Sequence, residues 1–340
     1  MHWNGAGFRE FSVGGRIPDF RANVGADILV AMQRLRTLVR FGAAVALLPL
    51  MAAPPTYGWG LEGHMMINRL AIQALPADVP AFLKTPEAIN EVEYLGPEPD
   101  RWRDSTEPEL NAAQAPEHFM DMEWADLAGP LPRKRYDFIR GLAAAQAKHP
   151  DVPLTPEKVG LQPYVTTEVW ERLKAAMRAY RTLSAEKKET KPVEAAILFY
   201  AGWLGHYVGD GSNPHHTSIQ YNGWTGPNPN GYTTEHKIHG LMESTYVKAN
   251  IKIAEVSPLV NKEPKLLGDV FDDYVAYLRQ SQTMVEKTYQ LEKAGGFMGS
   301  GTPEARSFID DRLAAGATEL RDMIYTAWVR SADPVPPYRP

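Results

Sequence analysis

Apolar side chains recur at helical spacing along most of the chain that follows residue 58. A period of three to four residues is typical of amphipathic α-helices that bury one face. No segment shows the two-residue alternation and tight turns of a β-hairpin. The pattern therefore predicts an all-α protein with a single multi-helix bundle domain. The expected helices lie within 61–75, 166–183, 193–208, 232–250, 266–294 and 303–331, and the expected connections are 184–192, 221–233 and 295–302.

The first 58 residues do not share this pattern. From Met32 onward, three arginines precede an apolar run over 41–53, and the small residue Gly58 stands just before Trp59. A basic region, a short apolar run and a small residue describe a secretory signal peptide, and the run is too short for a stable membrane span. We expect 1–31 to be an over-extended start, 32–58 a signal peptide, and 59–340 a secreted or periplasmic domain without a transmembrane segment. The alternative interpretation of the apolar run is a buried N-terminal helix.

Composition narrows the chemistry. The 340 residues are 44% hydrophobic, enough for a substantial core. They include no cysteine, which excludes disulfides and thiolate metal ligands. The leader holds six of the 36 basic and three of the 41 acidic residues, so residues 59–340 carry a formal charge of −8. This balance argues against a nucleic-acid binder that works through a broadly basic surface, although bound cations would change the charge locally.

Histidines and carboxylates form the clearest chemical pattern. His206 and Asp210 are four residues apart, His239 and Glu243 repeat this spacing, and His216 follows six residues after Asp210. On a helix, residues four apart share one face, so each pair can close on one metal ion. A lone pair is equally compatible with a hydrogen-bonded core histidine or a surface ion pair, but clustering within 206–243 favours a multi-metal site in a helical bundle. Sulfur-free nitrogen and oxygen ligands fit zinc, manganese or iron.

An ordered set of short motifs extends this pattern over residues 59–250. It resembles the superfamily that joins zinc-dependent phospholipase C to the single-strand-specific zinc nucleases. The set as a whole is specific, whereas a single His-x3-Asp is not. The motifs are Trp59-Gly60-Leu61-Glu62-Gly63-His64, Pro99-Asp100-Arg101-Trp102-Arg103, His118-Phe119-Met120-Asp121, His206-Tyr207-Val208-Gly209-Asp210, Asn213-Pro214-His215-His216 and His239-Gly240-Leu241-Met242-Glu243.

The resemblance implies about three zinc ions. It assigns Asp100, His118, His206 and Asp210 to one ion, and His216, His239 and Glu243 to another. The free amine and carbonyl of Trp59, with His64 and a bridging Asp210, hold the third, so cleavage before Trp59 creates a ligand. The implied reaction is attack of a zinc-bound hydroxide on a phosphodiester. The implied catalytic residues are Asp100, which is also a zinc ligand, and Arg103, which faces the phosphate. Alternatively, Arg103 is an exposed arginine paired with Asp104 or Glu107.

Three interpretations of the function are open. Trp59–His64 spacing, Arg103 and the His118 motif resemble the nuclease branch, which implies a single-strand-preferring nuclease or nucleotidase that cuts DNA and RNA internally. Glu243 and the absence of cysteine resemble phospholipase C, which implies phosphatidylcholine-type lipids. A zinc-binding protein without turnover is the third interpretation. Loop 221–233 follows the predicted site, and its rings could contact a base or a headgroup or could pack the loop onto the body. These rings belong to Tyr221, Trp224 and Tyr232. No stable protein partner is implied.

Overall fold

Helix α10 (Lys191–Ser212) is the helix around which the others pack. The computed structural model describes residues 59–103 and 106–335. Pro192 lies in the first turn of α10, where its missing N–H is not needed. The helix ends before Pro214, which disfavours helical backbone at Asn213. Almost every residue of its second half is buried.

The remaining α-helices range from 3 to 28 residues in length. Their bounds are α2 (Gly60–Gln73), α3 (Pro86–Leu95), α4 (Glu98–Arg101), α5 (Pro108–Gln114), α6 (Met122–Ala125), α7 (Arg135–Gln146), α8 (Pro156–Val159), α9 (Gln162–Ala185), α11 (Ile238–Gly240), α12 (Val247–Asn250), α13 (Ile253–Val256), α14 (Val270–Gln282), α15 (Val285–Lys293) and α16 (Pro303–Arg330).

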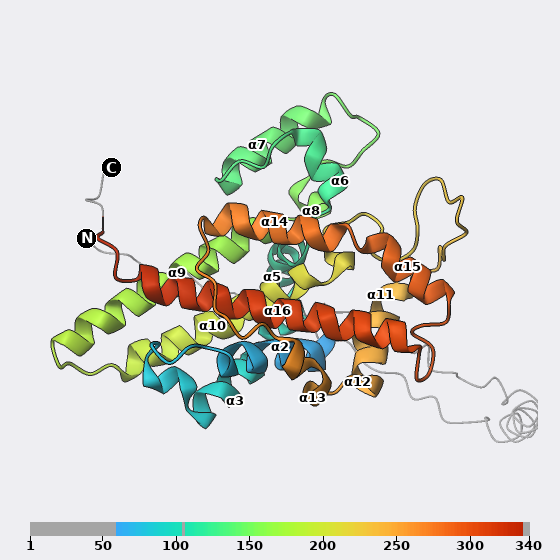
Figure 1. The fold of residues 1–340 in the computed structure, drawn as a ribbon. Coiled ribbons are helices and arrows are strands. Elements are labelled where there is room, and N and C mark those ends of the chain that lie inside the picture. Colours follow the sequence, from blue (N-terminus) through green and yellow to red (C-terminus); the bar gives the residue numbers. More distant parts are fainter. Residues whose placement is uncertain (1–58, 104–105, 336–340) are drawn as a thin grey trace, which may run out of the picture. The chain divides into compact units, whose positions relative to one another are not determined.

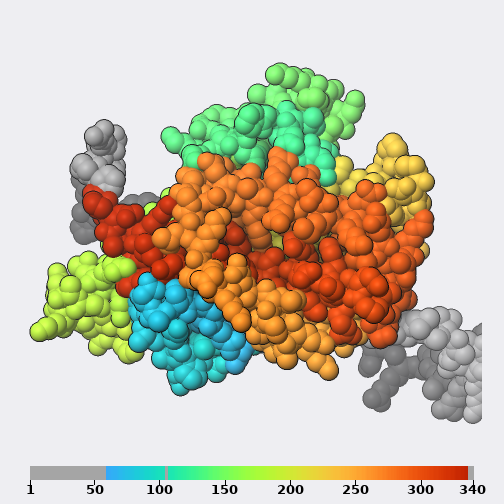
Figure 2. Space-filling view, in the orientation of Figure 1, coloured from blue at the N-terminus to red at the C-terminus, as the bar shows by residue number. Residues whose placement is uncertain are grey.

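Four helices enclose α10. It packs against α2, α3, α9 and α16, and α16 also packs against α2 and α9 (Figure 1). Helices α14, α15 and α16 run across the middle of the face that is shown in Figure 2. The hydrophobic core lies between these helices and includes side chains from each of them. Among the described residues, no helix combines the length and apolar character needed to cross a membrane.

Glycines allow α2 and α3 to approach the backbone of α10. A Cβ atom built at Gly205 would lie 1.9 Å from Oδ1 of Asn68, and one at Gly202 would lie 2.3 Å from Cβ of Leu95. Asn68 uses this close approach to donate from Nδ2 to the carbonyl of Gly202 (3.1 Å) and to that of Val92 (2.8 Å). The contact ties α2, α3 and α10 together at one level of the bundle.

The structure confirms the predicted all-α architecture. In the part of the chain it describes, β structure is limited to two isolated bridges. The helices expected within 61–75, 166–183, 193–208 and 303–331 correspond to α2, α9, α10 and α16. The predicted connections 184–192 and 295–302 also separate helices, while the leader expected over 1–58 lies outside the described residues.

Two helix predictions need correction. The segment 266–294 is not one helix, because α14 ends at Gln282 and α15 begins at Val285. Both helices bury apolar residues, so the apolar period continues through the break and hides it. The segment 232–250 contains α11, a π-helix (Leu241–Tyr246) and α12 instead of a single α-helix. Side-chain periodicity alone does not distinguish a π-turn from an α-turn.

Candidate metal centre

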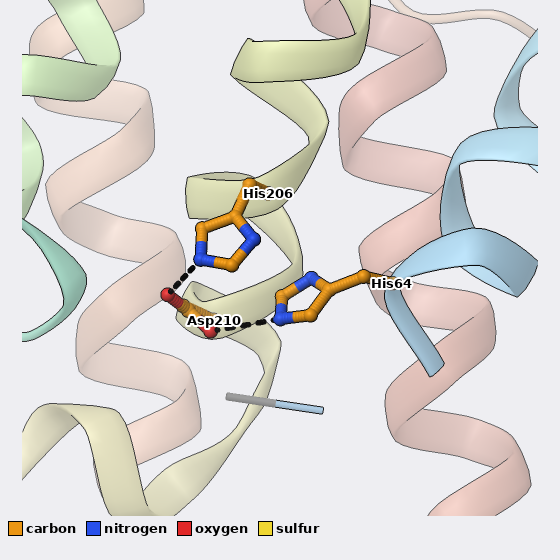
Figure 3. A group of neighbouring side chains, drawn as sticks. All are labelled: His64, His206 and Asp210. Atoms are coloured by element: carbon orange, nitrogen blue, oxygen red, sulfur yellow. Dashed lines mark ion pairs between the residues drawn. The ribbon is translucent and has the colours of Figure 1, made fainter. Parts of the chain in front are cut away.

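Asp210 is the point at which the predicted ligands converge. Its Oδ1 lies 3.3 Å from Nε2 of His64, on α2, and its Oδ2 lies 3.3 Å from Nε2 of His206, one turn earlier on α10 (Figure 3). Oδ2 also lies 3.1 Å from Nδ1 of His118, which ends the short 3₁₀-helix Ala115–His118. All four side chains are almost completely buried. One carboxylate thus touches three imidazoles from three separate segments.

Three buried groups of side chains could each hold a metal ion. In each group the ligand atoms lie within 4.8 Å of one another. The third group includes Glu243, whose Oε2 lies 2.8 Å from Nε2 of His239. The groups are His64, His206 and Asp210; Asp100, His118 and His206; and His216, His239 and Glu243. They contain every side chain that the sequence predicted as a metal ligand, apart from Trp59. His206 belongs to both of the first two groups, and Asp210 of the first group also touches His118 of the second.

Several atoms of these groups lack a hydrogen-bond partner although they are buried. They include both nitrogens of His64, both carboxylate oxygens of Asp100, Oδ1 of Asp210, Nε2 of His216 and Oε1 of Glu243. Buried polar atoms are normally paired, because an unpaired one costs about 1–3 kcal/mol. A cation at each group would pair one ligand atom of each of these side chains. The unpaired nitrogens and oxygens therefore fit a set of metal ions.

Backbone carbonyls orient three of the imidazoles. The Nδ1 atoms of His206, His216 and His239 lie 2.9, 2.7 and 3.1 Å from the carbonyl oxygens of Gly96, His118 and Tyr221. A carbonyl only accepts, so we assign the proton to Nδ1 in each ring. Each Nε2 then carries the lone pair that would bind a metal ion between the neighbouring side chains. Such outer contacts are typical of histidines that bind metal.

Burial and charge set the protonation of the groups. Burial lowers the pKa of His64 and, to a greater extent, that of His118, which keeps both rings neutral as metal ligands must be. Burial raises the pKa of Asp100 to about 7. Burial alone would lower the pKa of His216, but Asp210 and Glu243 raise it to about 9. The carboxylates thus attract positive charge into the third group.

Trp59 lies against the helix that carries Asp210. Its side chain is completely buried, and its indole Nε1 donates to the carbonyl of Gly209 (2.8 Å) and to Oγ of Ser212 (2.6 Å). Gly60 has a φ of +60°, and a Cβ there would lie 3.4 Å from the carbonyl of Glu243. The start of α2 is therefore held between the last turn of α10 and the backbone at Glu243. The role of the Trp59 amine and carbonyl as ligands stays a prediction.

A cavity of about 670 Å³ opens beside the second and third groups. His118, His216 and His239 line it, as does Arg103, whose Nη1 lies 3.8 Å from Oδ1 of Asp100. A phosphate in this cavity would meet both the ligand groups and a guanidinium. Arg103 lines the cavity, and its role toward a phosphate stays a prediction.

Of the three aromatic residues that were predicted to contact substrate, one lines the cavity and two do not. Tyr221 is 53% exposed and lines the cavity. Trp224 and Tyr232 are not among its lining residues. Their rings pack at 5.2 and 5.7 Å from the ring of Tyr289, which agrees with the alternative that they hold the loop on the body. For these two residues, the contacts therefore favour packing over substrate binding.

Two further buried residues line the cavity: Asp121, which the sequence did not single out, and His215, which the sequence left open as an alternative to His216. Asp121 is buried at the cavity, and burial with the nearby Glu123 raises its pKa to about 8. His215 is buried too, with Nε2 lying 2.9 Å from Oγ1 of Thr288 and its ring stacked 5.5 Å from that of His239. His215 belongs to none of the three groups, which agrees with the choice of His216 as the ligand. Asp121 ends the His118 motif, so its proximity to the site could have been anticipated.

Comparison of the chain with protein-family models, with curated proteins and with solved structures found no match. The fold and the site define a helical protein with three adjoining buried groups of histidine and carboxylate ligands beside a solvent-accessible cavity.

Proposed function

We propose that this protein is a zinc-dependent phosphodiester hydrolase, and specifically a single-strand-preferring nuclease or nucleotidase that acts on DNA and RNA. The observation that carries the proposal is the convergence of two ligand groups on Asp210, with a third group and Arg103 lining the cavity beside them. Adjoining cation sites suit phosphoryl transfer, since two or more metal ions can stabilise both the attacking and the leaving oxygen. The resemblance over 59–250 supports the same reaction.

The ligand chemistry favours zinc. The three groups offer only imidazole nitrogens and carboxylate oxygens, a donor set that zinc accepts. We propose that the Trp59 amine and carbonyl complete one group after export and cleavage before Trp59, so that the enzyme acts as a secreted or periplasmic protein. Bound zinc would polarise phosphoryl oxygens and lower the pKa of water.

The protein's own residues have distinct tasks in this proposal. Asp210 holds two ligand groups close together, and Asp100 provides a second carboxylate at the same point. Arg103 binds a phosphate oxygen and orients the diester toward the ligand groups. Tyr221, at the cavity rim, contacts the part of the substrate that leaves the cavity. The site thereby combines cation binding with orientation of an anionic ester.

The test uses purified protein that has been cleaved before Trp59 and loaded with zinc. We expect hydrolysis of bis(p-nitrophenyl) phosphate and release of acid-soluble nucleotides from single-stranded DNA and RNA. Arg103→Ala should lower kcat/KM roughly 100-fold, the usual cost of one transition-state donor. Arg140→Ala, an exposed arginine outside the cavity, is the matched control.

Other products would change the conclusion. Release of diacylglycerol from phosphatidylcholine without release of nucleotides would replace the nuclease by a phospholipase C. Zinc binding without hydrolysis of any of these esters would leave a metal-binding protein without turnover.

A further inference from the structure

The face of α10 that carries metal ligands continues toward the helix start as a line of aromatic rings. Phe199, Trp203, His206 and Asp210 follow one another at intervals of four, three and four residues, so they share one face. The Trp203 ring lies 5.9 Å from the Phe199 ring and meets the Trp102 ring edge to face at 5.3 Å. We name Trp102, Trp203 and Phe199 the aromatic strip.

The aromatic strip is partly exposed to solvent. Its residues lie on α10 and just after α4, and both of these helices also carry residues of the candidate site. Phe199 is 37% exposed, and the other two rings are partly exposed. Trp102 directly follows α4, which carries Asp100, and it precedes the cavity residue Arg103. The strip is therefore close to the candidate site along the chain, with Trp102 next to Arg103 and Trp203 one turn before His206.

Arginines accompany the rings. The guanidinium carbon of Arg172 lies 5.6 Å from the centre of the Trp203 ring, and that of Arg101 lies 4.4 Å from the centre of the Tyr94 ring. Arg101 also pairs with Glu98. Arg172 on Trp203, and Arg103 next to Trp102 in the chain, thus place two cationic groups with the aromatic strip on a chain whose formal net charge is −5. Aromatic rings with interleaved cations are the pattern of a surface that binds single-stranded nucleic acid.

We propose that the aromatic strip binds the bases of a single-stranded polynucleotide next to the phosphodiester that is cut. This inference rests on the proposed function and specifies its substrate as a polymer. From Phe199 to Trp203 the helix rises about 6 Å, which corresponds to roughly two bases stacked at about 3.4 Å. Rings stack on any base, so the strip adds affinity without sequence preference. Arg103 and Arg172 contact the adjoining phosphates.

Phe199→Ala is the main test because this side chain is exposed and belongs to none of the three ligand groups. Binding is measured by fluorescence anisotropy with a labelled single-stranded phosphorothioate 12-mer in the zinc-loaded protein. We expect roughly tenfold weaker binding, the usual effect of one lost stacking ring, and recovery in Phe199→Tyr. Arg172→Gln should reduce the slope of log affinity against log salt by about one. Tyr136→Ala removes an aromatic side chain that is 72% exposed on α7 and serves as the matched control.

A small substrate that has no bases to stack distinguishes the loss of base binding from structural damage to the site. Phe199→Ala should raise the KM for a single-stranded 20-mer about tenfold, while the kcat/KM for bis(p-nitrophenyl) phosphate changes less than twofold. Equal losses on both substrates, or an anisotropy curve within twofold of the parent, would overturn the proposal. Loss of binding to phosphatidylcholine and phosphatidylserine vesicles, with unchanged oligonucleotide affinity, would identify a lipid surface instead. If the parent protein hydrolyses no ester, the proposed function fails, and anisotropy still decides whether the strip binds nucleic acid.

Discussion

Replacement of Asp210 by asparagine tests the convergence of the ligands most directly. The two side chains have nearly the same shape, but the amide lacks the charge that faces His64, His118 and His206 at 3.1–3.3 Å. Asp210 belongs to one group and touches two histidines of another, whereas His216, His239 and Glu243 form the third without it. We therefore expect Asp210→Asn to retain about one zinc ion of about three.

The size of the effect follows from linkage between binding and folding. At free zinc a thousandfold above Kd, each site stabilises the folded state by about 4 kcal/mol, which corresponds to roughly 10 °C in Tm for a chain of this length. The loss of two sites should remove most of the zinc-induced rise in Tm. Comparing each variant with and without zinc cancels any change that the substitution makes to the metal-free protein.

The assay combines elemental analysis after gel filtration with thermal melts in zinc and in EDTA. Asp121→Asn is the matched control, because Asp121 is also buried at the cavity and burial raises its pKa to about 8. Its carboxyl is largely protonated at neutral pH, so the amide changes little charge. If Asp210→Asn holds as much zinc as the parent, with the same rise in Tm, then Asp210 does not join the first two groups.

Three further predictions concern the leader, the third group and pH. Protein that retains residues 1–58 should bind about one zinc ion fewer than protein cleaved before Trp59 and should be weakly active; equal zinc content and activity in the two forms would contradict the role of the amine. Glu243→Ala should lose one zinc ion because it removes the carboxylate paired with His239 at 2.8 Å, and unchanged zinc content by elemental analysis would show that the third group is misplaced. Burial and Asp322 raise the pKa of Glu319 from 4.5 to about 7. The folded state thus holds this proton more tightly than the unfolded state does, and the associated stability, present below pH 4.5, is lost as pH rises through 7. In EDTA, urea unfolding should show Glu319→Gln to be more stable than the parent by up to about 3 kcal/mol at pH 8 and nearly equal to it at pH 4.5; the same difference at both pH values would refute this.

Helical spacing in the sequence predicted much of the candidate site. His206 and Asp210 meet because α10 continues unbroken through both residues. The i,i+4 rule likewise brought His239 and Glu243 together, although the local backbone passes from α11 into a π-helix. The meeting of His64 and Asp100 with these pairs is a tertiary contact that no local pattern contains. Their place in the ordered motifs, not their spacing, identified them.

Other features depend on packing that the sequence does not encode locally. The break between α14 and α15 leaves the apolar period intact, so it is visible only in the backbone. The two aromatics Trp224 and Tyr232 share a loop with Tyr221, yet contact with Tyr289 turns them to the body of the protein. Loop composition predicted the presence of these rings but not their directions.

The close approach of α2 and α3 to α10 has a consequence for how such proteins can lose activity during evolution. Helix spacing at Gly202 and Gly205 is set by absent side chains, since a single added methyl would overlap Leu95 or Asn68. His64 lies on α2 only one turn from Asn68, so moving these helices apart would also separate His64 from Asp210. A descendant with alanine at position 205 could keep every histidine and carboxylate and still be unable to assemble the centre. A count of histidines and carboxylates alone would then miss the loss of the centre.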